Sequence, residues 1–122
     1  MTILKIEPYK SPEVIEIDGS LETMQSIVGG LIQSVYPFDD PIALVCNDEG
    51  KLLNLPANHI LLDPETEDIR DIIFGTFFLC GAPADSENFT SLTPEQIKTY
   101  TDLFYAPEII LRTSIGVLVT RI

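Results

Sequence analysis

The stretch from Ile72 to Leu79 carries no charged side chain, and only Gly75 and Thr76 interrupt its apolar residues. A strand with one face in water alternates apolar and polar residues, whereas a continuous apolar run needs cover on both faces. The run therefore predicts a central strand around which the sheet of this chain is organised.

Shorter β-rich runs predict the other strands of the sheet. These runs are Ile3–Ile6, Val14–Ile17, Leu31–Tyr36, Ile42–Cys46, Ile109–Leu111 and Ile115–Ile122. Each successive pair is separated by a short segment of turn-forming residues, and the first two of these segments contain prolines, which cannot donate to a strand ladder. The pattern predicts three hairpins.

Polar segments separate the remaining parts of the chain. The segment Asn47–Gly50 predicts a turn, in which Gly50 suits a positive φ. Residues Leu52–Leu62 are expected to be irregular, because a proline and an asparagine interrupt them. The segment Asp63–Asp71 holds five acids and one arginine in nine positions, which predicts an exposed loop or a single helical turn.

Two helices are expected, and the second has the clearer start. Thr93 can act as N-cap, Pro94 suits the first helical position, and Gln96 completes a capping box. Pro107 is expected to stop this helix through the restriction that it places on the preceding residue. The residues expected to form its buried stripe are Ile97, Tyr100 and Phe104.

The first helix is expected to begin after Ser20, which can cap it, and to end at Gly29-Gly30, which suits a left-handed stop. Its apolar residues, at a helical spacing, are Leu21, Met24, Ile27 and Val28. With 122 residues, the chain is long enough for one core. We therefore predict a single α+β domain over residues 1–122, with a mostly antiparallel sheet of five to seven strands and both helices on one face.

The net charge of the chain limits the kinds of partner that it can bind. Nineteen acids against seven lysines and arginines give a formal net charge of −12, which repels phosphate backbones and disfavours direct binding of nucleic acid. The acidic surface either keeps the protein in solution or imitates a phosphate array. The N-terminal residues lack a signal-peptide pattern and no apolar run approaches 18 residues, so we expect a cytoplasmic protein without membrane contact.

Catalytic and metal-binding patterns are missing from the sequence. Cys46 and Cys80 both lie in apolar runs, where a buried thiol resists ionisation. His59 is the single histidine, and no nucleophile motif accompanies it. The spacing of the acids fits neither a calcium loop nor a pair of glycosidase carboxylates. We therefore expect no catalytic residue, no metal, no cofactor and no enzymatic activity.

A small group of polar and aromatic residues remains for ligand binding. The expected ligand-binding residues are Lys51, Asn58, His59, Arg112 and Tyr36. Lys51 lies close in sequence to Asn58 and His59, so we expect these three side chains to share one rim of the sheet. They offer a positive charge, an amide that can contact a base edge, and a donor or stacking ring.

Four segments, in this order, resemble one protein family. They are Asn47–Lys51, Leu55–His59, Asp71–Gly81 and Phe89–Tyr105. Their arrangement is similar to domain-of-unknown-function family 3846, and the resemblance covers most of the chain from about Gly19 onward. That family is met in phages and mobile elements, so the resemblance implies a bacterial host cell and assigns no chemistry.

Three functions of different kinds follow from this resemblance and from the missing catalytic motifs. The first is a counter-defence factor that sequesters a small nucleotide immune signal. The second is an acidic inhibitor that imitates nucleic acid and covers the basic groove of a host defence nuclease. The third is an interaction domain in mobile-element replication or transfer. We favour the first slightly, because a concave pocket can overcome an unfavourable net charge through hydrogen bonds and stacking.

The sequence also points to an association surface. An unpaired edge strand is a template for pairing with another chain, and small sheets have few ways to cover it. The apolar C-terminal hairpin is the expected edge, and a homodimer or higher oligomer would cover it.

Overall fold

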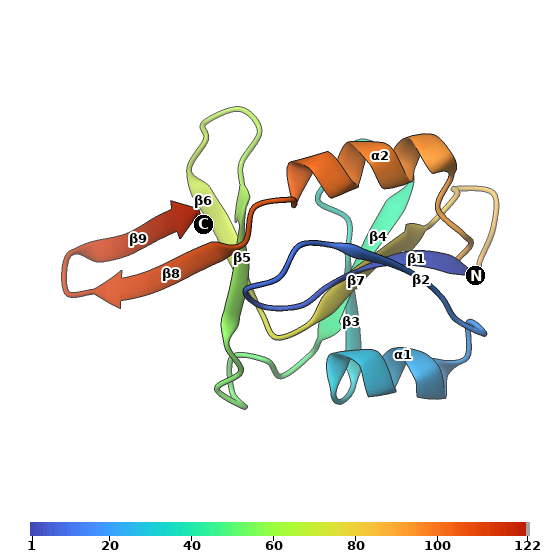
Figure 1. Cartoon of the computed structure of the whole chain (residues 1–122), viewed down its shortest axis with the longest axis horizontal. Helices are drawn as coiled ribbons and strands as arrows, with labels where there is room; N and C mark the ends of the chain where they lie inside the picture. The colour runs from blue at the N-terminus through green and yellow to red at the C-terminus, as the bar shows by residue number, and fades with distance from the viewer. Residues whose placement is uncertain (122) are drawn as a thin grey trace.

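The computed structural model of the chain describes residues 1–121, and its largest sheet has five antiparallel strands (Figure 1). Strand β7 occupies the central position, and all five of its residues are buried. The prediction of a central strand covered on both faces is confirmed for this part of the apolar run. The strand order is β2 (Glu13–Glu16), β1 (Thr2–Ile6), β7 (Phe77–Gly81), β4 (Ile42–Asn47) and β3 (Ile32–Val35).

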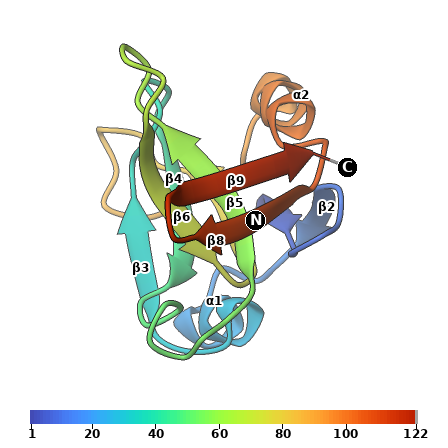
Figure 2. The same ribbon diagram turned by 90° about the vertical axis from the view of Figure 1, so that its left-hand side faces the viewer.

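The other strands form two separate antiparallel pairs. Strand β5 (Ala57–Leu62) pairs with β6 (Ile69–Phe74), and β8 (Glu108–Thr113) pairs with β9 (Gly116–Arg121). Figure 2 shows the β8–β9 hairpin crossing in front of β5 and β6. Residues 1–121 thus contain nine strands in three sheets, rather than five to seven in one. The α+β class and the three predicted hairpins are confirmed, while residue 122 lies outside the described residues.

The apolar run does not form one continuous strand. Gly75 has a φ of +81°, which glycine adopts without steric cost, and its N–H donates to the carbonyl oxygen of Pro56 at 2.7 Å. The chain bends there, so β6 ends at Phe74 and β7 begins at Phe77. The expectation of a single strand over Ile72–Leu79 was therefore wrong, because the bend places its two halves in different sheets.

Helices α1 (Leu21–Val28) and α2 (Pro94–Leu103) cover opposite faces of the five-stranded sheet (Figure 1). The buried residues of α1 belong to the apolar cluster that contains Phe78, whereas Tyr100 of α2 belongs to the cluster that contains Leu79. Successive strand residues point to opposite faces of a sheet. Phe78 and Leu79 are neighbours in β7, so the two clusters lie on opposite faces of the five-stranded sheet. The expectation that both helices share one face was wrong, because helical periodicity does not say which side of a sheet a helix covers.

Both helices begin at the predicted capping residues. The Thr23 N–H donates to Ser20 Oγ at 3.2 Å, and Gly29 ends α1 with a left-handed φ of +79°. At α2 the Gln96 N–H donates to Thr93 Oγ1 at 3.2 Å, and the Thr93 N–H donates to Gln96 Oε1 at 2.9 Å. This reciprocal capping box satisfies backbone donors that no helical carbonyl can reach.

The buried stripe of α2 is confirmed, and the reason for the end of the helix differs from the prediction. Tyr100 and Phe104 are buried, and Ile97 packs beside them. The helix ends at Leu103 with Phe104 as C-cap. Pro107 restricts the backbone of Ala106, which already lies outside the helix. Pro107 therefore leads the chain into β8 rather than stopping the helix.

Three expectations for the polar segments need correction. Gly50 does not adopt a positive φ; a Cβ there would lie 2.8 Å from the Phe74 carbonyl oxygen, so glycine permits a close approach. The segment predicted to be irregular contains β5, because residues 57–62 pair with β6. The loop Asp63–Asp68 is largely exposed as expected, but Ile69–Asp71 belongs to β6.

Replacement of Thr93 by Ala removes the acceptor of the capping box. We expect the free energy of unfolding to fall by about 1 kcal/mol, measured from urea denaturation followed by circular dichroism. Thr99→Ala is the matched control, since Thr99 is an exposed residue inside the same helix and alanine favours helix interiors. Equal effects of the two substitutions would contradict the capping role.

Candidate functional site

A cavity of about 210 Å³ lies between the C-terminal end of α2, strand β5 and the base of the β8–β9 hairpin. We name it the hairpin-base pocket. Binding sites for small molecules combine apolar walls with a few convergent polar groups, and this pocket has both. Its apolar walls include Phe38, Leu61, Leu62, Pro64, Leu103 and Phe104, and its polar side chains are His59, Glu108 and Arg121.

The carboxylate of Glu108 is buried in the wall of this pocket, with only 3% of the residue exposed. Its Oε1 accepts from the Ile60 N–H at 2.9 Å, and its Oε2 accepts from Arg121 Nε at 3.3 Å. A buried carboxylate without partners would cost several kcal/mol, so these two bonds are what allow Glu108 to remain inside. They also attach both strands of the hairpin to the pocket.

The guanidinium of Arg121 lies at the mouth of the pocket, and 65% of the side chain is exposed. Within residues 1–121, its hydrogen bond to Glu108 uses Nε. The two terminal nitrogens therefore keep their donors for another acceptor. Because Glu108 holds the group in place, Arg121 presents an oriented fork that suits a carboxylate or a phosphate.

The imidazole of His59 is 2% exposed and packs edge-on against two phenylalanine rings. The ring centroids lie 5.2 Å from Phe104 and 6.1 Å from Phe77. Its Nδ1 lies 2.8 Å from Asn58 Oδ1, and its Nε2 lies 3.3 Å from the carbonyl oxygen of Ala106. His59 thus connects β5 to the segment between α2 and the hairpin.

Asn58 sets the tautomer of this histidine. Its Nδ2 group donates to two carbonyl oxygens, those of Ile6 and Gly75, both at 2.9 Å. The amide oxygen of Asn58 is therefore the acceptor that faces His59. Because this acceptor is the nearer one, at 2.8 Å against 3.3 Å for the Ala106 carbonyl, Nδ1 of His59 carries the proton in the neutral ring. Nε2 then carries the lone pair, and it donates to the Ala106 carbonyl only when the ring is protonated.

Burial lowers the pKa of His59 below its ordinary value of 6.5. The nearby carboxylate of Glu108 and the Ala106 carbonyl act in the opposite direction, and Arg121 adds to the lowering. Desolvation is the largest of these effects, since a charged imidazolium loses its hydration among the aromatic rings. His59 is therefore a neutral group of the pocket wall at pH 7.

The structure disperses the five residues that the sequence suggested for ligand binding. Asn58 and His59 are buried, and only His59 lines the hairpin-base pocket. Lys51 and Arg112 both lie over the ring of Phe74, at 5.8 and 5.0 Å from its centroid. The expected shared rim of Lys51, Asn58 and His59 does not form, because Asn58 is buried and its amide forms hydrogen bonds inside the core.

Tyr36 lies outside the hairpin-base pocket, and 62% of the residue is exposed. Conversely, sequence reasoning missed Glu108. In the sequence, Glu108 is a single acid between Pro107 and an apolar run, and an acid in such a position is usually solvated. Its burial depends on the Ile60 N–H from a distant strand, which no local pattern reveals.

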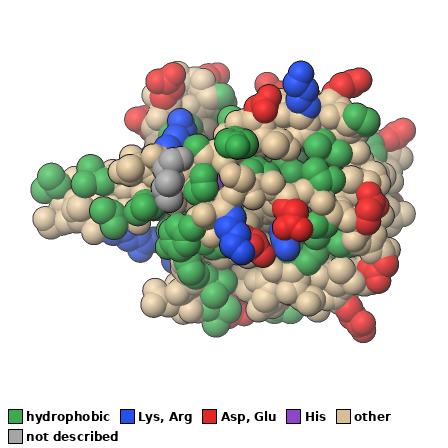
Figure 3. Space-filling model, in the orientation of Figure 1, with side chains coloured by type: hydrophobic (Ala, Val, Ile, Leu, Met, Phe, Trp, Pro, Cys, Tyr) green, Lys and Arg blue, Asp and Glu red, His purple; other side chains and the backbone are tan. Residues whose placement is uncertain are grey.

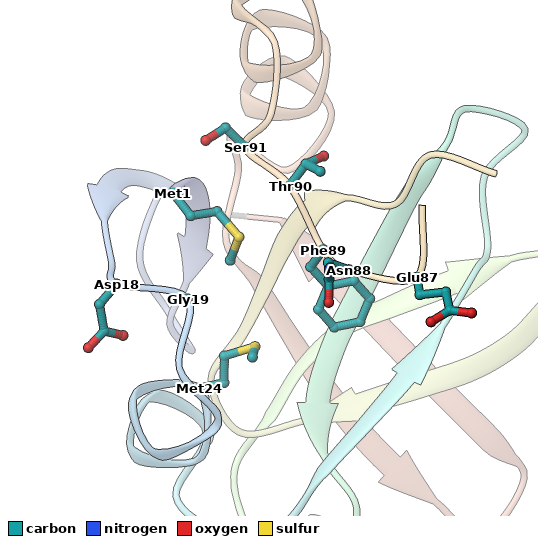
Figure 4. A pocket seen from close by; sticks show the side chains of 9 residues that line it. All are labelled: Met1, Asp18, Gly19, Met24, Glu87, Asn88, Phe89, Thr90 and Ser91. Atoms are coloured by element: carbon teal, nitrogen blue, oxygen red, sulfur yellow. The ribbon is translucent and has the colours of Figure 1, made fainter. Parts of the chain in front are cut away.

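A second hollow, of about 580 Å³, lies between the start of α1 and residues 87–91. Figure 4 shows Met1, Met24 and Phe89 around its centre, with the carboxylates of Asp18 and Glu87 at opposite edges. Among the described residues, no Lys, Arg or His side chain lines it. The hollow is therefore less suited to an anionic ligand than the hairpin-base pocket.

Neither cysteine offers a reactive thiolate. Burial raises the pKa of Cys46 to about 11 and that of Cys80 to about 12, so both thiols stay protonated at pH 7. Within residues 1–121 no group of three or more His, Cys, Asp or Glu side chains is arranged to hold a metal ion. In the same residues no helix has the length and apolar character needed to cross a membrane.

One family model matches this chain, and its description is "Domain of unknown function (DUF3846)". The match covers residues 1–105, so it begins before the Gly19 boundary expected from the sequence and ends before β8. The β8–β9 hairpin thus lies outside the matched range. No curated protein and no solved structure matches the chain.

The lowered pKa of His59 predicts the pH dependence of stability. Below pH 6.5 the unfolded chain binds a proton that the folded chain does not, so the free energy of unfolding falls as the pH falls toward the folded pKa. His59→Gln removes the single imidazole and isolates this contribution. We expect the urea midpoint to fall more steeply between pH 7.5 and 5.5 in the wild type than in the variant.

The opposite difference would contradict this assignment. A wild type that gains stability on acidification, relative to the variant, has a raised pKa at His59. Parallel curves would show that His59 titrates alike in the folded and unfolded chains.

Proposed function

The chain belongs to the DUF3846 family, and on that premise we propose that it is a non-catalytic binding protein that sequesters a small nucleotide in the hairpin-base pocket. The observation that carries the proposal is the combination of an apolar cavity with one oriented guanidinium at its mouth. A nucleotide has the matching combination of a flat ring and an anionic group.

The walls of the pocket favour a flat ring. Phe38 and Phe104 both line it, with ring centroids 6.2 Å apart, and leucine and proline side chains provide further apolar surface. Stacking of a base on an aromatic side chain contributes about 1–3 kcal/mol and tolerates any base. An apolar pocket of this kind supplies affinity without needing a positively charged protein.

Arg121 is suited to the anionic group. A guanidinium that forms two parallel hydrogen bonds recognises phosphate strongly and with a defined geometry. The fixed position of Arg121 against Glu108 reduces the entropy lost on binding. This local arrangement offsets the net charge of −12, which repels phosphate at long range.

The volume of the pocket limits the size of the ligand. Pockets for drug-sized ligands measure roughly 300–1,000 Å³, and this one measures about 210 Å³. It therefore fits one base with its sugar rather than two bases. The nucleotide signal that we propose is accordingly a mononucleotide or cyclic mononucleotide, not a cyclic dinucleotide.

The polar groups of the pocket also support binding without turnover. Both nitrogens of His59 face hydrogen-bond acceptors, and Glu108 is paired with Arg121 and with the Ile60 N–H. A general base needs a lone pair within reach of its substrate. The Glu108 oxygens accept hydrogen bonds inside the protein, and Nε2 of the buried His59 is directed at the Ala106 carbonyl. In the phage or mobile-element setting that is part of this proposal, such a protein would lower the concentration of an immune signal in the bacterial cytoplasm.

The proposal is tested by calorimetric titration with AMP, GMP, CMP, UMP, their 3′,5′-cyclic forms and cyclic dinucleotides. We expect at least one mononucleotide to bind and the cyclic dinucleotides to bind at least tenfold more weakly. Leu103→Trp should raise the Kd at least tenfold, because Leu103 lines the pocket and is 59% exposed, so the indole can fill the cavity without disturbing the core.

Matched controls come from other exposed positions of the chain. Leu21→Trp places the same ring on α1, where Leu21 is 54% exposed and lies on the opposite face of the sheet. Arg121→Gln should weaken binding, whereas Lys98→Gln removes an exposed cation of α2 outside the pocket. The proposal is wrong if no mononucleotide binds, or if Leu103→Trp and Leu21→Trp have equal affinity. Salt-sensitive capture of a basic protein instead would favour the acidic-inhibitor function.

A further inference from the structure

The β8–β9 hairpin projects from the body of the protein (Figure 1) and carries an apolar outer face. Leu111 pairs with Leu118 and Ile109 pairs with Thr120, so these four side chains share one face of the hairpin. The exposed fractions of Ile109, Leu111 and Leu118 are 38%, 55% and 59%, and that of Ile115 at the tip is 97%. We name these four apolar residues the hairpin stripe.

The charges of the hairpin lie on its other face. Arg112 and Arg121 alternate with the stripe residues along the strands. Arg112 lies over the ring of Phe74, and Arg121 pairs with the buried Glu108. The outer face therefore has no charged side chain between residues 109 and 121, although the chain as a whole has a net charge of −12.

Strand β9 is also an unprotected edge. Within residues 1–121 it pairs on one side only, with β8. Proteins protect such edges with charged side chains, and the outer strand β2 of the large sheet follows that rule with Glu13 and Glu16. Residues 116–120 of β9 hold no charge. This uncharged edge, with its free backbone N–H and C=O groups, lies beside the hairpin stripe.

We propose that this surface docks a second copy of the chain, with the two β9 strands antiparallel across a two-fold axis. A two-fold contact requires a surface that complements itself, and an uncharged strand edge with an apolar stripe does so. The pairing would continue the two-stranded sheet into four strands. The stripes of both copies would then lie side by side on one face.

Electrostatics favours this place of contact over the acidic parts of the surface. Two chains with a net charge of −12 repel each other wherever their acidic bodies approach. Figure 3 shows apolar side chains on the projecting hairpin, basic ones toward its base, and both acidic and basic ones on the body, where the acids are more numerous. A six-residue strand extends about 20 Å, whereas the screening length at physiological ionic strength is about 8 Å. Contact through the hairpins therefore keeps the two bodies farther apart than the screening length, where the repulsion between their charges is weak.

Sedimentation velocity of the full chain, from 10 µM to 1 mM, tests the proposal. We expect a monomer–dimer equilibrium that shifts toward dimer with concentration, because a contact between two short hairpins is small and therefore weak. Added NaCl should strengthen the dimer, since salt screens the repulsion between the bodies. Leu118→Lys should weaken dimerisation at least tenfold, because it brings two positive charges together near the axis.

Leu52→Lys is the matched control, since Leu52 is 84% exposed and lies outside the hairpin. Both variants should retain the circular dichroism spectrum of the wild type, and Thr120→Lys serves as a second hairpin variant if Leu118→Lys does not fold. A wild type that stays monomeric at 1 mM overturns the proposal. Equal dimerisation of Leu118→Lys and wild type overturns it as well. A dimer that dissociates on addition of salt would instead place Arg112 or Arg121 against the acidic body of the second copy.

Discussion

The carboxamide of Asn58 is the junction on which the arrangement of this protein depends. Its two donors hold the end of β1, through the Ile6 carbonyl, and the bend at Gly75 that separates β6 from β7. Its oxygen orients His59, whose Nε2 lies against the Ala106 carbonyl just before the hairpin. One fully buried polar side chain thus links the five-stranded sheet, the β5–β6 pair and the C-terminal segment. Buried amides of this kind are costly unless every donor and acceptor is satisfied.

The hairpin-base pocket follows from this junction. His59 forms part of its wall only because Asn58 holds the imidazole among the aromatic rings. Glu108 then anchors β8 to β5 through the Ile60 N–H and fixes Arg121 at the mouth. The same contacts hold the inner face of the hairpin against the body and leave its apolar outer face to solvent. Ligand binding and self-association, as proposed, would therefore use opposite faces of one element.

Local signals in the sequence predicted the parts of the fold that local interactions determine. The capping box at Thr93, the left-handed stop at Gly29 and the three hairpins all follow from neighbouring residues. The break at Gly75 was missed because an uninterrupted apolar run does not show where a strand changes sheets. Asn58 and Glu108 were misjudged or missed because their burial depends on backbone groups far away in the sequence. Polar side chains are usually solvated, and only tertiary contacts reveal the exceptions.

The central claim, that an oriented Arg121 at an apolar pocket receives an anionic ring compound, is tested most directly by nuclear magnetic resonance of the Arg121 side chain. In ¹⁵N-labelled protein, the hydrogen bond to Glu108 should slow the exchange of the Arg121 Nε proton with solvent, so that its Nε–H signal is observed. Titration with a nucleoside monophosphate should shift this signal together with the Ile60 and Leu103 amides, while the Lys98 amide stays unchanged. Shifts at Lys51 and Arg112 around Phe74, with no change at Arg121, would contradict the account.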